Sequence, residues 1–167
     1  MDVMEGIYTR RSVRQFTGEP LPRETLLEIM KAGTWAPSGL NNQPWRFVLI
    51  RDEAMRRKLA SFTTYGTTIM NAPACIAVFA DRVRMYHDVK DHQAIGACIE
   101  NMLLAAHALG VGAVWLGEIL KNAGAVRSLF ELPESLELMA VVACGYPGEK
   151  KGMSNRYPLE DVLVKEV

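Results

Sequence analysis

A basic segment near the N-terminus has the residue types that bind an oxyanion. Three guanidinium groups and a hydroxyl lie within five residues, those of Arg10, Arg11, Ser12 and Arg14. If the segment is extended, Arg10, Ser12 and Arg14 point to one face, because side chains alternate along an extended chain. Arg11 and Val13 then point to the other face. Guanidinium groups bind phosphate oxygens bidentately, so the segment suits a phosphate or a polyol phosphate, and a solvated basic turn is the alternative.

The stretch APSGLNNQPWRF at 36–47 is either a connection between two elements or a surface that holds a ligand. Its two prolines fit an ordinary connection. Its polar side chains offer more donors and acceptors than a turn requires, and Trp45 adds a large flat surface. Such a loop suits a planar polar heterocycle. The polar side chains are those of Ser38, Asn41, Asn42 and Gln43.

A third candidate ligand-binding segment is VWLGE at 114–118, at the end of a predicted strand. A glycine at a strand end, here Gly117, lets the backbone approach a ligand closely. A core Trp115 followed by a turn is the alternative interpretation.

The sequence shows no obvious nucleophile, metal cage or nucleotide-binding turn. The three histidines lack a convincing metal-ligand spacing. Gly110 and Gly112 precede a strand, whereas the glycines of a dinucleotide-binding turn precede a helix. Ser12 and Ser38 lack the flanking residues of a nucleophile elbow. We therefore expect no metal and assign no catalytic side chain, and the polar and aromatic segments indicate a cofactor that brings its own chemistry.

The composition predicts a single domain over residues 1–167. A chain of 167 residues, 49% of them hydrophobic, can bury one sizeable core. Nineteen basic residues balance nineteen acidic ones, so no net charge attracts nucleic acid or an anionic membrane. No segment has the roughly 18 apolar residues that a membrane span needs. Cys75, Cys98 and Cys144 have apolar neighbours, which indicates buried thiols in a reducing compartment, and we expect a cytoplasmic protein.

Helices and strands are interspersed along the chain. Apolar spacing predicts helices at 3–10, 21–33, 53–62, 91–109 and 123–130. Apolar and β-branched runs predict strands at 46–51, 74–80, 112–117 and 138–145. The helix at 91–109 is apolar around most of its circumference, so we expect it to be central and buried on several sides. The tail at 146–167 has two Tyr-Pro pairs and alternating charges, which predicts an arm over the surface or over a neighbouring subunit.

Four motifs together resemble the FMN-dependent nitroreductase family. They are RRSVRQF near the N-terminus, APSGLNNQPWRF after the first long helix, AIGACIENMLLAAHALGVGAVWLG, and the late pair GYPGEKK and NRYPLEDV. Their order and gaps match along nearly the whole chain, which is short for the family. The resemblance implies an α+β fold with a central, mostly antiparallel sheet wrapped by helices. It also implies an intertwined homodimer with FMN at the interface, and the tail as an arm over the partner subunit.

The resemblance further implies which residues hold FMN. The basic motif for the FMN phosphate, ribityl chain and pyrimidine edge matches Arg10, Arg11, Ser12 and Arg14. The loop that reaches the flavin from the partner subunit matches Pro37, Ser38, Gly39, Asn41 and Gln43. A polar residue near the ring edge matches Asn71, and the backbone contact region near the ring matches Leu116 and Gly117. The late basic residue that closes on the phosphate matches Arg156.

The activity that the resemblance implies is hydride transfer from NAD(P)H through flavin N5 to a small acceptor, such as a nitroaromatic or a quinone, with ping-pong kinetics. A fixed cation such as Arg14 would stabilise the negative charge that reduction creates near the flavin N1 and O2 atoms. Two alternatives stay open. One is a specialised family member, such as a flavin-fragmenting enzyme, a dehalogenase or a dehydrogenase, and the other is a regulatory module that binds flavin without turnover.

Overall fold

The centre of the structure, a computed structural model, is a four-stranded sheet in the order β1-β2-β4-β3. The structure describes residues 1–148, 152 and 154–167. The strands are β1 (Trp45–Ile50), β2 (Ala74–Asp81), β3 (Gly112–Leu116) and β4 (Leu136–Gly145). Each strand pairs with its neighbour in antiparallel fashion, which confirms the sheet type that the family resemblance implied.

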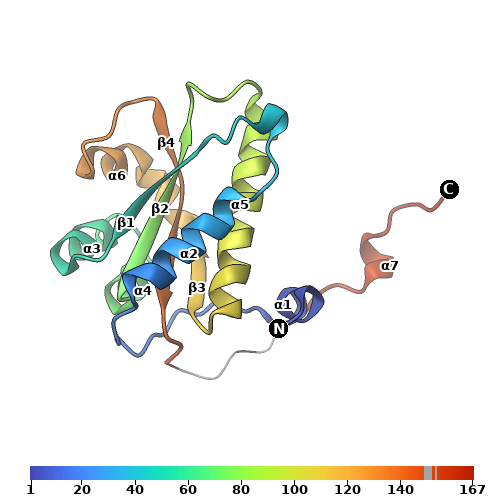
Figure 1. The fold of residues 1–167 in the computed structure, drawn as a ribbon, viewed down its shortest axis with the longest axis horizontal. Helices are drawn as coiled ribbons and strands as arrows, with labels where there is room; N and C mark the ends of the chain where they lie inside the picture. The colour runs from blue at the N-terminus through green and yellow to red at the C-terminus, as the bar shows by residue number, and fades with distance from the viewer. Residues whose placement is uncertain (149–151, 153) are drawn as a thin grey trace.

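Most helices in the described part of the chain pack around this sheet, whereas α7 lies in the tail, away from it (Figure 1). They are α1 (Val3–Thr9), α2 (Arg23–Thr34), α3 (Glu53–Ala60), α4 (Gly66–Asn71), α5 (Asp88–Ala108), α6 (Ala123–Leu129) and α7 (Leu159–Val162). Two short 3₁₀ turns, η1 (Gly39–Asn41) and η2 (Glu118–Asn122), lie in the connections.

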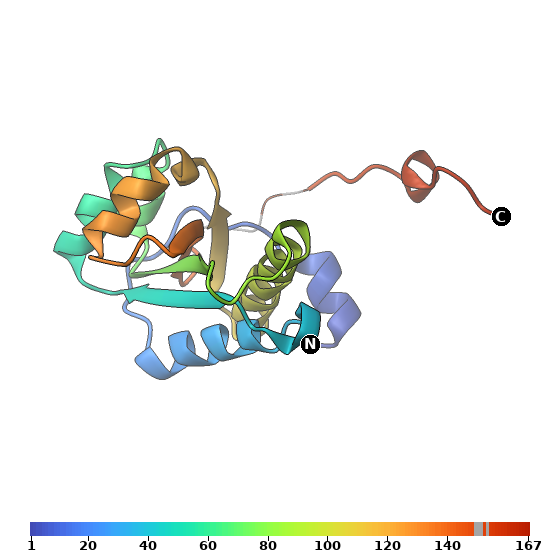
Figure 2. The same ribbon diagram turned by 90° about the horizontal axis from the view of Figure 1, so that it is seen from above.

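Helices cover both faces of the sheet, with α2 and α5 on one face and α3, α4 and α6 on the other (Figure 2). The side chains of β2 alternate between the two cores. Ile76 and Val78 pack on the side of α2 and α5, whereas Cys75, Ala77 and Phe79 pack on the opposite side. Because both faces of this strand are buried, its sequence is an uninterrupted apolar run. The strand expected at 74–80 is confirmed.

The long buried helix expected at 91–109 is α5, which begins earlier, at Asp88. Its buried side chains face both α2 and the sheet. The two helices approach closely at Gly33 of α2, where an added Cβ atom would lie 2.7 Å from Cγ of Met102 and 3.0 Å from Sγ of Cys98. A larger residue at position 33 would push α2 away from α5, so this glycine sets the spacing between the two helices.

The other predicted elements are confirmed to within a few residues at their ends, and two short helices were not expected. One is α4, whose sequence GTTIMN begins with glycine and includes two threonines, residues with low helix propensity. Thr68 and Ile69 of this helix are buried, so α4 forms because its side chains pack against the core. The other is α7, which lies in the tail.

The three cysteines are free thiols in the core, as their apolar neighbours indicated. Burial raises the pKa of Cys75 and of Cys98 to about 12, and it also raises the pKa of Cys144. A thiol with such a pKa carries almost no thiolate near neutral pH, so these cysteines are chemically inert in the folded protein.

Residues 1–148, 152 and 154–167 contain neither a metal-binding cluster nor a membrane-spanning helix. No group of three or more His, Cys, Asp and Glu side chains is arranged there to hold a metal ion. No helix in these ranges combines the length and the apolar character needed to cross a membrane.

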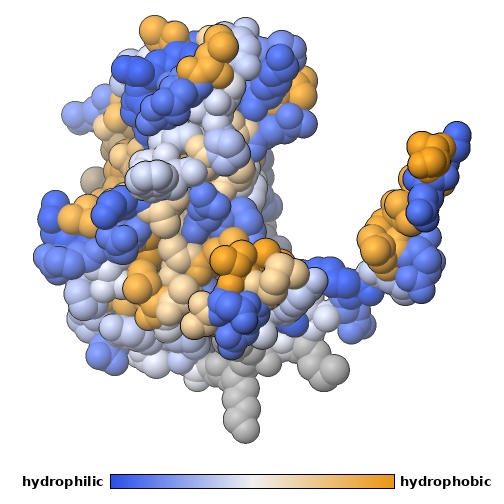
Figure 3. Space-filling view, turned by 45° about the vertical axis from the view of Figure 1, so that its right-hand side comes forward, coloured by the Kyte–Doolittle hydropathy of each residue, from blue (hydrophilic) through white to orange (hydrophobic). Residues whose placement is uncertain are grey.

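The tail leaves the domain after a short stretch that pairs with its own chain. Phe16 forms an antiparallel bridge with Pro147, and Gly148 N donates to Gln15 O at 2.9 Å. Residues 149–151 and 153 of the expected arm lie outside the described residues. Residues 154–167 extend away from the domain, and hydrophobic side chains lie exposed along this tail (Figures 1 and 3).

Candidate functional site

The basic segment at the N-terminus and the tail together form a polar cavity of about 370 Å³. We call it the basic cavity. Its lining residues are Arg10, Arg11, Ser12, Arg14, Gly152, Ser154 and Arg156. The structure therefore brings together Arg156 and the four residues of the basic motif, although more than a hundred residues of sequence separate them.

The basic segment is held in place by β3. Val13 N donates to Ala113 O at 3.1 Å, and Ser12 forms a parallel bridge with Ala113. The Val13 side chain is buried next to Gly112, where an added Cβ atom would lie 2.8 Å from Val13 Cγ1. Val13 therefore points inward, as the expected alternation requires. Arg11 nevertheless lines the cavity as well, because the segment makes a single bridge and is not a regular strand.

The guanidinium groups of the basic cavity differ in the hydrogen bonds and ion pairs that they make within their own chain. Arg10 Nε lies 3.3 Å from Glu100 Oε1 on α5. Arg11 Nη1 donates to the carbonyl oxygens of Tyr8 and Arg10 at 2.8 and 2.7 Å. Arg14 is exposed, and its side chain is accessible to a ligand. Arg156 donates to the Ser154 hydroxyl and to Asn155 O.

The polar loop at 36–47 forms a second cavity of about 270 Å³, which we call the loop cavity. It is lined by Pro37, Ser38 and Gly39 together with Lys90, Gln93, Ala94 and Ala97 of α5. The backbone of the loop is unusual, because Leu40, Asn41 and Gln43 have φ values of 54°, 54° and 49°. Such left-handed conformations cost roughly 1–3 kcal/mol each outside glycine, and they persist only where surrounding contacts impose them.

The two cavities lie beside different parts of α5. The loop cavity is beside residues 90–97, whereas Arg10 of the basic segment contacts Glu100. Thr9, the last residue of α1, lies next to the C-terminal end of α5, with its Oγ1 atom 2.8 Å from His107 Nε2. None of the lining residues is shared between the two cavities. Within one chain, the loop residues and the basic residues are therefore not brought together.

The remaining predicted site residues have different surroundings. Leu116 is buried in the core on the side of α6, and Gly117 follows it at the start of η2. Trp115 is 40% exposed, and its ring packs next to Gly96 of α5. A Cβ atom added at Gly96 would lie 3.8 Å from Cη2 of this ring. Asn71 is exposed at the last residue of α4 and lines neither cavity.

A hydrogen-bond network next to Gly117 was not predicted. Glu118 Oε2 accepts from Thr63 Oγ1 at 2.6 Å and from Thr64 N at 3.0 Å, and Glu118 Oε1 pairs with Lys121. The hydrogen bonds from Lys121 and Thr63 lower the pKa of Glu118 to about 2. This network ties the loop at 62–65 to the strand end. A sequence pattern could not reveal the link to this loop, because Thr63 and Thr64 are more than fifty residues from Glu118.

The chain is similar to several known proteins along most of its length. A sequence profile described as the Nitroreductase family matches residues 7–68 and 63–146. A protein of Archaeoglobus fulgidus, provisionally named NADH dehydrogenase/NAD(P)H nitroreductase, is 39% identical over 90% of this chain and 88% of its own length. The FMN reductase [NAD(P)H] of Bacillus subtilis is 27% identical over 99% of this chain and 74% of its own.

A solved structure has nearly the same fold. It is a crystal structure of a protein from Desulfovibrio desulfuricans, provisionally called a nitroreductase, in complex with FMN. Its TM-score is 0.95 at 47% identity, and the match covers 100% of this chain and 98% of that one.

We expect Glu118→Gln to lower stability at neutral pH and to have less effect in acid. The folded-state pKa of about 2 lies below the ordinary value of 4.5, so the carboxylate contributes stability above about pH 4.5. That contribution is lost as the pH falls through 2. The measurement is the urea midpoint of each protein at about pH 7 and about pH 2.5. Glu134→Gln, at an exposed position, is the control, and an equal difference at both pH values would contradict the prediction.

Proposed function

The chain belongs to the nitroreductase family, and on that premise we propose that it passes hydride from NAD(P)H to a small oxidised acceptor, such as a nitroaromatic or a quinone. It is an FMN-dependent oxidoreductase that uses NAD(P)H. The observation that carries the proposal is the basic cavity, which gathers four arginines and two serines from the two ends of the chain.

The donor set of the basic cavity suits the FMN phosphate. A phosphate monoester carries close to two negative charges, and four guanidinium groups with two hydroxyls supply many donors for its oxygens. Each charge-assisted hydrogen bond contributes roughly 1.5–3 kcal/mol. Arg14, which is exposed, and Arg156, which comes from the tail, are free to turn toward the ligand without breaking an ion pair with Glu100.

The other residues proposed for FMN follow from the same family pattern. Bound FMN supplies hydride transfer at N5, with the nicotinamide leaving before the acceptor enters. We assign the backbone around Leu116 and Gly117 to the edge of the flavin ring, and Asn71 to a polar contact beside it. Pro37, Ser38, Gly39, Asn41 and Gln43 are assigned to the flavin bound by a second copy, because α5 keeps this loop away from the basic cavity of its own chain.

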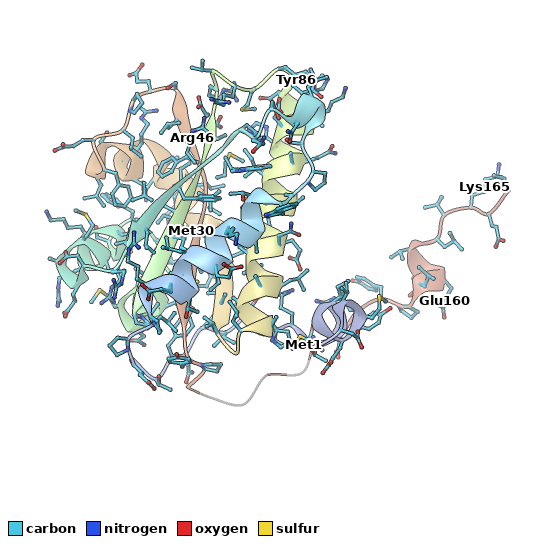
Figure 4. The ribbon with its side chains drawn as sticks, in the orientation of Figure 1. Met1, Met30, Arg46, Tyr86, Glu160 and Lys165 are labelled. Carbon is cyan, nitrogen blue, oxygen red and sulfur yellow. The ribbon has the colours of Figure 1, made fainter. Side chains whose placement is uncertain are left out.

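We also propose that two copies form a homodimer in which the tail of one covers the edge of the other's sheet. Among the described strands, β1 pairs only with β2, so the other edge of β1 is unpaired. A groove of about 560 Å³ follows its outer edge, and it includes Met30 of α2 and Arg46 of β1 (Figure 4). The extended tail offers Leu163 and Val164 for such a groove. Arg46 is already paired with Asp81, at 2.7 Å, so we assign the contact to the apolar side chains of the tail.

The test of the function is anaerobic reduction of the purified protein. We expect the purified protein to carry bound FMN and to lose the flavin absorbance bands when NADH or NADPH is added without oxygen. Adding a nitroaromatic or a quinone should restore the bands, and initial rates should give the parallel double-reciprocal lines of ping-pong kinetics. If neither nicotinamide bleaches the flavin, the reductase proposal is wrong.

Arg14→Ala should weaken FMN binding and lower the midpoint potential of the flavin. Loss of one charge-assisted contact corresponds to roughly a tenfold to hundredfold rise in Kd. The lower potential follows because a fixed cation stabilises the reduced, anionic flavin. The measurements are a flavin fluorescence titration and a redox titration. Arg51→Ala removes an exposed arginine outside the basic cavity and is the control. Unchanged affinity and potential in the Arg14 variant would exclude this role.

Removing residues 159–167 should shift the protein from dimer to monomer. The truncation deletes the apolar side chains that we place on the neighbouring sheet edge, and it leaves Arg156 in the chain. Sedimentation velocity measures the change, and removal of residues 166–167 alone is the matched control. A truncated protein that remains fully dimeric at the same concentration would show that the arm does not hold the two copies together.

A further inference from the structure

The buried carboxylate of Asp91 connects the start of α5 to the polar loop. Asp91 is completely buried. Its Oδ2 accepts from Tyr86 N at 2.9 Å and from His87 N at 2.8 Å, the two backbone groups just before the helix. Its Oδ1 accepts from Asn42 Nδ2 at 2.5 Å. One side chain therefore closes the N-terminal turn of α5 and also binds the loop that carries the proposed flavin contacts.

Asp91 is ionised in this position. Burial by itself would raise the pKa of Asp91, but the hydrogen bonds from His87, Asn42 and Tyr86 outweigh it and lower the pKa below the usual value. A buried charge of this kind requires all of its hydrogen-bond donors, because an unpaired one is costly in the protein interior. The loop can therefore leave Asp91 only at a high cost in free energy.

The orientation of the Asn42 amide follows from its neighbours. Its Nδ2 group donates to Asp91 Oδ1 and also to Arg84 O at 3.0 Å. Both partners are acceptors, so the nitrogen of the amide must face them. Asn42 lies between Asn41 and Gln43, whose left-handed φ values are 54° and 49°. The bond to Asp91 thus anchors the loop at the residue between two strained positions.

A second contact from the same region fixes the other end of η1. An added Cβ atom at Gly39 would lie 1.9 Å from the Tyr86 hydroxyl oxygen, so the Tyr86 side chain lies directly against Gly39. Tyr86 is beside the η1 turn near the start of α5 (Figure 4). Its backbone N–H is one of the donors to Asp91. Ser38 Oγ accepts from Gln43 N at 3.1 Å and closes the loop on itself.

We infer that Asp91, acting through Asn42, is a positioning residue that holds Ser38, Asn41 and Gln43 in the conformation that binds FMN. This inference rests on the proposed function, because the loop's role is to contact the flavin. Asp91 does not touch the cofactor itself. If Asp91 only caps α5, loss of its contact with Asn42 would change the stability of the fold and leave FMN binding unaffected.

The main experiment compares Asn42→Ala with wild type. This variant leaves both backbone hydrogen bonds of Asp91 in place, so the cap of α5 is kept. We expect FMN to dissociate from the holoprotein roughly tenfold to hundredfold faster, since the lost bond joins the loop to a charged group. The melting temperature of the apoprotein should fall as well, because the buried Asp91 carboxylate loses one of its three donors. FMN release is therefore compared at a temperature well below the melting temperatures of both proteins. Asp88→Asn, in the same helical turn but paired with Arg82, is the matched control and should leave FMN release unchanged.

A swap of the two side chains tests the direct contact. Asn42→Asp places two carboxylates together, and it should release FMN faster than Asn42→Ala does. In the double variant Asn42→Asp/Asp91→Asn, the new amide at 91 can accept from Tyr86 and His87 and donate to the new carboxylate at 42. The hydrogen bond from position 42 to Arg84 O stays lost in this variant, which limits the recovery. We expect this double variant to recover part of the lost FMN retention, which a helix cap alone would not produce.

The outcomes separate the two proposals. A wild-type protein that neither binds FMN nor reacts with NAD(P)H would contradict the proposed function. A wild-type protein that binds FMN, together with an Asn42→Ala variant of unchanged FMN release, would overturn the positioning role alone. Hydrogen exchange at residues 38–43 provides a second readout, and we expect faster exchange in Asn42→Ala than in Asp88→Asn.

Discussion

The packing of α5 between α2 and the sheet is the constraint on which the other features depend. Gly33 brings α2 against Met102 and Cys98, and the same helix contributes Ile95 and Ile99 to the core on that face of the sheet. A helix buried in this way cannot bend or slide without losing many contacts at once, because protein interiors are close-packed. The segments attached to its two ends therefore hold fixed positions relative to each other.

This rigidity explains why the proposed site is divided. The loop cavity adjoins the first half of α5, and the basic cavity adjoins the segment that contacts Glu100 and His107. In the proposed arrangement, an FMN molecule bound in the basic cavity of one chain does not contact the loop of that chain. In the proposed homodimer the second copy supplies the loop. FMN binding and association of the two copies would then depend on each other, since each stabilises the other by mass action.

The charged groups of the protein have two distinct functions that follow from their burial. Asp91 is fully buried, and its hydrogen bonds keep it ionised, so it acts on structure and is inaccessible to ligand. Arg14 is exposed, and its charge is available to an anion. Glu118 lies between these cases, because Thr63 and Lys121 keep its carboxylate ionised at the edge of the proposed flavin site. The arrangement separates groups that shape the site from groups that bind in it.

The sequence by itself determined the helices and strands with strong apolar patterns, the buried thiols and the family. The run at 74–80 is apolar throughout because helices cover both faces of β2, and the pattern at 91–109 is apolar on most sides because α5 is central. The short helix α4 was missed because packing of Thr68 and Ile69 holds it against weak propensity. Only the tertiary structure decided that Asn42 faces Asp91 and that Glu118 holds Thr63. These hydrogen bonds join segments about fifty residues apart, and residue spacing carries information only about neighbours along one helix or strand.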